Sequence, residues 1–135
     1  MKKEGFSLVE LLAVIAIMAI LVLIAMPNVM EMYNQAKKQS FLNEAKVLFK
    51  EAVVVYVAEK KKGNKLSEFN SNDPYDSYLT ESNLKYCVEL DTKGRVTSLK
   101  VSNGSYYIEG AGNFLSADVS MVREGTYEDL SCLIE

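Results

Sequence analysis

The chain has 135 residues, with 15 basic and 18 acidic side chains and a net charge of −3. This length allows one domain besides an apolar N-terminus. The sequence contains no histidine, which removes the commonest general base and the commonest metal ligand. The excess of acids also argues against a nucleic-acid-binding protein. Composition therefore predicts a small domain with a membrane segment.

The first predicted element is an apolar helix over Phe6–Met26, which is polar only at Ser7 and Glu10. As a helix this run is about 32 Å long, enough to cross a hydrocarbon core of about 30 Å. It is also longer than the apolar part of a secretory signal peptide. Lys2 and Lys3 assign the N-terminal side to the cytoplasm, which places the C-terminal domain outside.

Glu10 is the unusual residue of this segment, because a charge at the centre of a membrane helix costs about 2.5–3.5 kcal/mol. Two interpretations remain open: the carboxylate reaches the headgroups at the cytoplasmic end, or it pairs with a buried cation. Cleavage between Gly5 and Phe6 would supply that cation. The cut creates an α-amine on Phe6 with an unperturbed pKa of about 8.

The stretch KKEGFSLVELLAVIAIMAILVLIAMPNV resembles the N-terminus of type IV pilins and pseudopilins. A short basic leader ends at Gly5, Phe6 begins the mature chain, and Glu10 is its fifth residue. Pro27 lies where that family has a helix-kinking proline. The resemblance implies that a prepilin peptidase cuts after Gly5 and that Phe6 is N-methylated. It also implies that Glu10 neutralises the Phe6 amine of a neighbouring subunit during assembly.

The helical pattern continues beyond Pro27 and predicts a helix that ends near Lys60–Lys62, with Gly63 as its C-cap. Six apolar residues at helical spacing form the face that we expect to be buried: Phe41, Ala45, Leu48, Phe49, Ala52 and Tyr56. Pro27 either bends one long helix or begins a separate soluble helix. Both interpretations fit the sequence.

The remainder of the chain predicts β-structure. Leu84–Leu90 and Arg95–Val101 alternate in polarity around a turn at residues 91–94, and Ser105–Gly110 gives a third antiparallel strand. This sheet should cover the buried face of the helix. Phe114–Val122 is either a further strand or a short helix, and Ser67–Asn83 is a polar loop.

The predicted fold class is therefore α+β, with a long N-terminal helix packed on a small antiparallel sheet head, as the pilin resemblance also implies. Four segments are expected. Residues 1–5 form the leader peptide, and residues 6–27 the transmembrane and polymerisation helix. Residues 28–62 form the amphipathic helix of the head, and residues 63–135 the connecting loop, the sheet and a C-terminal disulfide region.

The two cysteines, Cys87 and Cys132, match neither a zinc-site spacing nor a CxxC redox motif. Outside the membrane they predict one disulfide, which would close a loop of about 46 residues worth about 4 kcal/mol. Two free buried thiols are the alternative. The resemblance favours the bond, because many type IV pilins close a C-terminal region in this way and major pseudopilins generally lack it.

No other motif predicts a catalytic, metal or cofactor site. The acids considered as calcium ligands lack EF-hand spacing and are expected to be solvated: Asp118, Glu124, Glu128 and Asp129. Asn103-Gly104-Ser105 is a glycosylation sequon that fits a hairpin turn better. The lysines at 60–62 fit a solvated helix end better than a contact with DNA phosphates. A nucleic-acid partner is thus unsupported.

The functional prediction is a structural protein rather than an enzyme: the major subunit of a type IV pilus. It would be a single-pass protein of the cytoplasmic membrane before assembly and part of a surface filament afterwards. The resemblance implies a helical homo-oligomer, with a platform protein and an ATPase as assembly partners. The alternative is a pseudopilin of a type II secretion or competence DNA-uptake system. A membrane-anchored enzyme or sensor is unsupported, since no nucleophile–base pair or phosphate loop is present. The sequence leaves open whether the filament serves twitching motility, cell adhesion, biofilm formation or DNA uptake.

Overall fold

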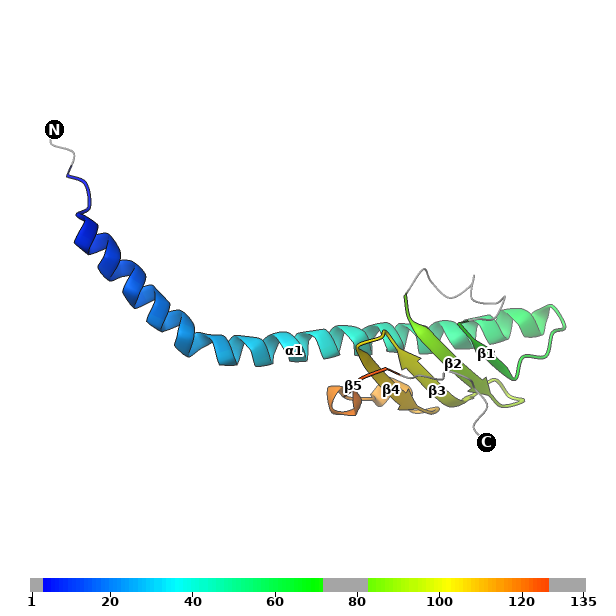
Figure 1. Ribbon diagram of the computed structural model, residues 1–135. Coiled ribbons are helices and arrows are strands. Elements are labelled where there is room, and N and C mark those ends of the chain that lie inside the picture. The colour runs from blue at the N-terminus through cyan, green and yellow to red at the C-terminus, as the bar shows by residue number, and fades with distance from the viewer. Residues whose placement is uncertain (1–3, 72–82, 127–135) are drawn as a thin grey trace. The chain divides into compact units, whose positions relative to one another are not determined.

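A computed structural model describes residues 4–71 and 83–126 of the chain. The chain divides into two compact units, Met1–Ala36 and Lys37–Glu135. Helix α1, Leu8–Lys61, contributes its N-terminal part to the first unit and its C-terminal part to the second (Figure 1). All strands belong to the second unit.

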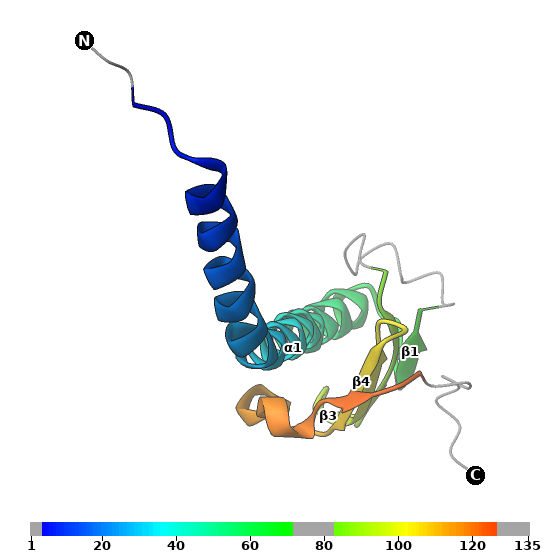
Figure 2. The ribbon, with the colours of Figure 1, turned by 60° about the vertical axis from the view of Figure 1, so that its left-hand side comes forward.

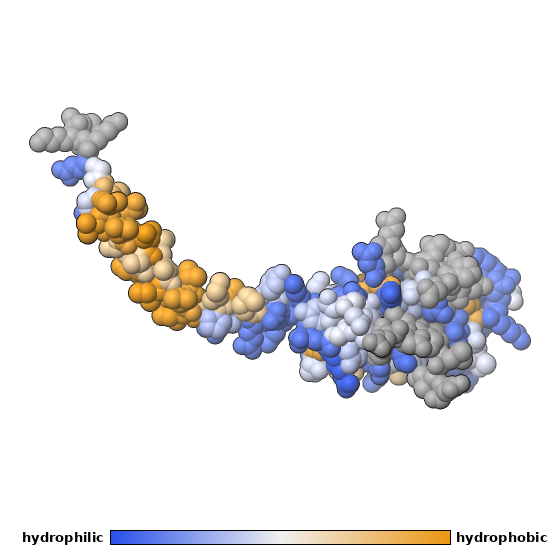
Figure 3. Space-filling model, in the orientation of Figure 1, coloured by the Kyte–Doolittle hydropathy of each residue, from blue (hydrophilic) through white to orange (hydrophobic). Residues whose placement is uncertain are grey.

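The first unit is the apolar part of α1. The helix is long and apolar enough to cross a membrane, and none of its most apolar window is buried within the chain. The apolar residues form a continuous hydrophobic surface along this part of the helix (Figure 3). Pro27 lies inside α1, which continues across it, so Pro27 does not begin a separate helix. A bend at Pro27 stays a prediction.

The second unit contains a five-stranded antiparallel sheet in the order β1-β2-β3-β4-β5. Figure 2 shows this sheet from another side, with β1, β3 and β4 labelled. Its strands are β1 Glu68–Asn70, β2 Lys85–Leu90, β3 Val96–Ser102, β4 Tyr106–Gly110 and β5 Arg123–Glu124. The central pairing places Val88 opposite Leu99 and Val101 opposite Ile108. These four side chains are buried because they all lie on the sheet face that meets the helix.

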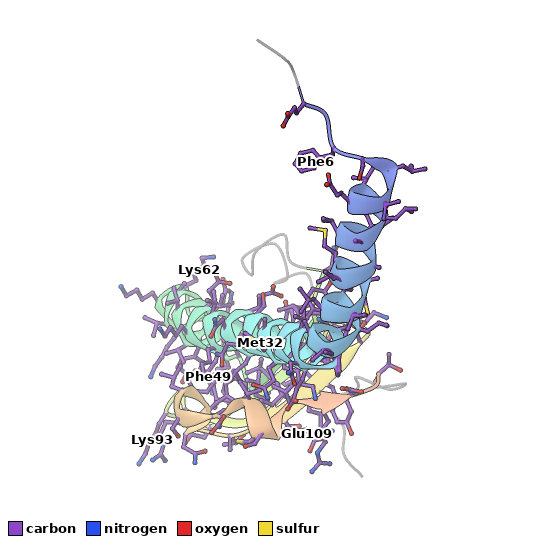
Figure 4. The ribbon with its side chains drawn as sticks, turned by 90° about the vertical axis from the view of Figure 1, so that its left-hand side faces the viewer. Phe6, Met32, Phe49, Lys62, Lys93 and Glu109 are labelled. Carbon is purple, nitrogen blue, oxygen red and sulfur yellow. The ribbon has the colours of Figure 1, made fainter. Side chains whose placement is uncertain are left out.

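The predicted buried face of the helix is confirmed, since all six of its residues are 8% exposed or less. Phe49 points from α1 toward the sheet layer (Figure 4) and stacks on Phe114, with ring centroids 5.8 Å apart. Phe41 contacts Tyr106 in a tilted arrangement, with ring centroids 6.2 Å apart. The helix therefore closes one face of the sheet with aromatic and aliphatic side chains, as the periodicity predicted.

The three predicted strands are confirmed with small changes of boundary, but the sheet is larger than predicted. Strand β1 lies within the segment predicted as a polar loop, so that prediction is wrong for Glu68–Asn70; residues 72–82 of the same loop lie outside the described residues. Strand β5 was also missed. The segment Phe114–Val122 forms two short 3-10 helices, η2 Phe114–Ser116 and η3 Val119–Met121.

The C-terminal end of α1 has the predicted glycine cap. Gly63 adopts φ +87°, a conformation that only glycine adopts at low cost. The N–H of Gly63 donates to the carbonyl of Lys60, and the N–H of Asn64 donates to the carbonyl of Glu59. These two bonds form a Schellman motif, which satisfies carbonyls that the helix leaves free at its end.

Candidate functional site

The predicted cleavage position lies just before the helix. Gly5, Phe6 and Ser7 precede the first helical residue, Leu8. Phe6 is 91% exposed, and a side chain added at Gly5 would meet no atom within 4 Å. The Gly5–Phe6 bond is therefore in non-helical, accessible backbone, as a protease needs. The preceding residues 1–3 lie outside the described residues.

Ser7 and Glu10 cap the start of α1 through two reciprocal hydrogen bonds. The backbone N–H of Glu10 donates to Ser7 Oγ at 3.2 Å, and the N–H of Ser7 donates to Glu10 Oε2 at 3.1 Å. This arrangement is a capping box, in which a serine at the cap and a glutamate three residues later each satisfy one free N–H group. The carboxylate also faces the positive end of the helix dipole.

The capping box gives Glu10 a role inside a single chain. A helix start leaves four N–H groups without helical partners, and a membrane offers little water to bind them. The two bonds satisfy the N–H groups of Ser7 and Glu10. Ser7 was missed as a site residue, although the spacing Ser-x-x-Glu was a readable signal in the sequence. Glu10 Oε1 accepts no hydrogen bond within the part of the chain that the structure describes.

The helix that follows presents large apolar side chains on every side. The most exposed are Leu8, Val9, Leu23, Ile24 and Met32, which are 67–75% exposed. A helix that is apolar all round is stable only inside a membrane or a large assembly. This segment therefore needs lipid or other helices around it.

Glu59 is the buried carboxylate of the second unit, with an exposed fraction of 2%. Lys62 Nζ donates to its Oε1 at 2.7 Å, and Asn64 Nδ2 donates to its Oε2 at 2.6 Å. The hydrogen bond from Lys62, and after it the one from Asn64, lowers the pKa of Glu59 below its ordinary value. The cluster fixes the end of α1 to the segment that leads into β1, which is a structural role.

Cys87 is buried in β2 and does not carry a free thiol. The predicted partner, Cys132, lies outside the described residues. The Cys87–Cys132 pairing thus stays a prediction.

The remaining candidates have structural partners. Asn103 Oδ1 accepts from the N–H groups of Ser105 and Tyr106, so the sequon forms the expected turn. Asp118 accepts from the N–H of Ser120, and Glu124 pairs with Lys38 at 3.2 Å. Glu128 and Asp129 lie outside the described residues. Among those described, no group of three or more histidine, cysteine, aspartate or glutamate side chains is placed to hold a metal ion.

A hollow of about 520 Å³ lies between the end of α1 and the β2–β3 turn. Tyr56, Leu66 and Leu90 supply its apolar lining, and its polar residues include Lys60 and Asp91. Arg95 holds Asp91: its backbone N–H, ahead of the other contacts, lowers the pKa of this carboxyl. Asp91 therefore stabilises the turn.

Comparison with known proteins bears on the N-terminal residues. Residues 1–26 match the prokaryotic N-terminal methylation motif. Comparisons with curated proteins and with solved structures gave no match. The matched region contains Gly5, Phe6 and Glu10, and with them the capped start of α1 and most of its apolar surface.

Proposed function

We propose that this type IV pilin-like chain is the major subunit of an extracellular type IV pilus. Its methylation motif is typical of type IV pilins and pseudopilins, and one long helix followed by a small antiparallel sheet is a pilin-like layout. The observation that carries the proposal is Glu10. It lies at the start of a wholly exposed apolar helix, with one carboxylate oxygen that accepts no hydrogen bond within the described residues.

Cleavage after Gly5 would give Phe6 a positive amine, which the peptidase then methylates. In the filament, Glu10 of one subunit pairs with the Phe6 amine of its neighbour. The capping box supports this pairing, because Ser7 occupies Oε2 and leaves Oε1 to accept the amine. The apolar side chains of adjacent helices then pack together, and Glu10 is no longer exposed to lipid.

The subunit would wait in the cytoplasmic membrane with its C-terminal side outside, until a platform protein and an ATPase add it to the fibre. Residues 1–5 are the leader, 6–27 the polymerisation helix, 28–62 the helix of the head, and 63–135 the loop, sheet and disulfide region. Pro27 would let the polymerisation helix bend. A Cys87–Cys132 bond would secure the C-terminal residues; non-reducing mass measurement after alkylation tests it, and alkylation of both thiols would contradict it.

A pseudopilin of a secretion or DNA-uptake system would share the N-terminal residues, the cleavage after Gly5 and the insertion into the membrane. The length of the filament at native expression distinguishes the two functions, because a pilus subunit forms long surface fibres without overexpression. The predicted Cys87–Cys132 bond favours the pilus subunit, because the pilin resemblance associates such a bond with many type IV pilins and not with major pseudopilins. Fibres that form only on overexpression would favour the pseudopilin.

Two variants test the proposal. Gly5→Asp should leave an uncleaved precursor, because the peptidase must hold small, extended backbone at this position; N-terminal sequencing that still finds Phe6 first would contradict the cleavage site. Glu10→Val should be cleaved and inserted in the membrane but should give no surface fibres. Normal fibres from Glu10→Val, imaged and quantified after shearing, would show that charge pairing does not drive assembly.

A further inference from the structure

The helix of the second unit and the remainder of that unit differ in charge composition. Residues 37–62 contain seven lysines and three glutamates, whereas residues 63–135 contain six basic and twelve acidic side chains. The helix of the second unit is thus basic and the remainder of that unit is acidic.

The basic surface is the outward side of α1, which we name the helix strip: Val47, Lys50, Val54, Val57 and Lys61. These residues follow one another at helical spacing, on the side opposite the buried face. The three valines are 46–66% exposed. Neither lysine makes a hydrogen bond or an ion pair within the described residues. An apolar strip with free cations has the composition of a contact surface.

Two carboxylates lie side by side on the sheet. Glu68 of β1 lies directly opposite Glu89 of β2. Side chains so placed have Cβ atoms about 5 Å apart, and two like charges there destabilise the strand pair. Neither carboxylate has a hydrogen bond or an ion pair in the part of the chain described by the structure. A cation from outside would remove the repulsion. We name Glu68 and Glu89 the carboxylate pair.

We propose that the helix strip of one copy docks on the carboxylate pair of a second copy of this chain. The inference rests on the proposed function and adds a contact between heads to the packing of apolar helices. Because the two surfaces differ, the contact is heterologous. A heterologous contact relates each subunit to the next by the same rotation. When that rotation does not close a ring, the contact repeats along an open helical filament. Charge complementarity selects the second copy as the occupant, since the chain itself carries both surfaces.

The test uses the full chain in cells that make fibres. Lys50→Glu should reduce sheared fibres about ten-fold, because it places a third carboxylate against the carboxylate pair. Lys93→Glu is the matched control: it makes the same charge change on an exposed lysine outside the helix strip and should leave the yield unchanged. The double variant Lys50→Glu with Glu89→Lys should restore fibres, since it exchanges the two charges.

Cleavage and membrane level are measured in each variant, and because Lys50 is exposed we expect both to stay normal. Equal fibre yield from Lys50→Glu and Lys93→Glu overturns the inference, as does failure of the double variant to recover. If fibres are lost in Glu10→Val but kept in Lys50→Glu, the pilus function stands and the head contact falls. If the unaltered chain forms no fibres, both fall.

Discussion

Replacing Glu10 by Gln separates the two roles of this side chain. Glutamine keeps an amide oxygen that accepts the hydrogen bond from the Ser7 N–H, as Glu10 Oε2 does at 3.1 Å. It removes the charge that would pair with the Phe6 amine. Glu10→Val removes both the hydrogen-bond acceptor and the charge. Ser7→Ala removes the hydroxyl that accepts from the Glu10 N–H and leaves the Glu10 charge in place.

The expected magnitudes differ enough to rank these variants. Loss of a helix cap costs about 1 kcal/mol, or roughly five-fold in an equilibrium constant. Two unit charges 4 Å apart attract by about 4 kcal/mol at an effective dielectric constant of 20, or roughly a thousand-fold. Gln and Val at position 10 should therefore both abolish fibres, whereas Ser7→Ala should lower the yield only several-fold.

The assay is the ratio of sheared fibre subunit to membrane subunit, read by quantitative immunoblotting, with cleavage confirmed by intact mass. Ser7→Ala serves as the control for a disturbed helix start with an intact charge. Fibre yield from Glu10→Gln within about three-fold of the unaltered chain would refute the charge-pairing account. The hydrogen bonds of the capping box would then be the reason for a glutamate at this position.

Two further predictions concern the head. Gly110→Ala places a methyl group against the ring of buried Phe114, so it should lower the free energy of unfolding by about 1–3 kcal/mol and the Tm in detergent by at least about 4 °C. Adding Phe114→Leu to the same chain should recover part of this loss. An unchanged Tm in Gly110→Ala would contradict the packing. The pKa of the Glu59 carboxyl is lower in the folded state than its ordinary value of about 4.5, so the ionised carboxylate stabilises the fold at neutral pH. This stabilisation is lost as the pH falls below about 4.5 and through the lower pKa of the folded state. Glu59→Gln should be less stable at pH 7 and lose less on acidification, as thermal melts at several pH values would show; parallel pH profiles would contradict this role.

The parts predicted from sequence are those with a repeated local signal. The buried face of α1 follows from apolar residues that recur at helical spacing, and β2, β3 and β4 follow from alternation around glycine-containing turns. Strand β1 has three residues, Glu-Phe-Asn, and β5 has two, Arg-Glu. Runs so short carry no alternation pattern, and they become strands only because a neighbouring strand offers free hydrogen-bonding groups at the sheet edge.

For the polar sites, the spacing of residues in the sequence predicts some contacts and not others. The capping box was predictable, because Ser7 and Glu10 have the required spacing before an apolar run. Burial of Glu59 was not, since a glutamate beside three lysines is typical of a solvated helix end. Its carboxylate is bound by Lys62 at the helix end and, after the turn at Gly63, by Asn64.

Apolar packing alone cannot fix how neighbouring helices align, because lipid tails are as apolar as the helix surface and the side chains offer many similar contacts. Polar groups must therefore set the register. In the proposed assembly Glu10 would pair at the start of α1 away from water, where salt would not screen it. The helix strip is exposed and the carboxylate pair is half-buried, so both remain open to salt, and a Debye length of about 8 Å at physiological salt weakens their attraction. Raising the salt concentration should therefore loosen contacts between heads before it affects the apolar helices, and fibres in high salt should become more flexible before they break. Fibres that instead release subunits without first losing stiffness, as seen by electron microscopy, would show that the heads contribute no separate contact.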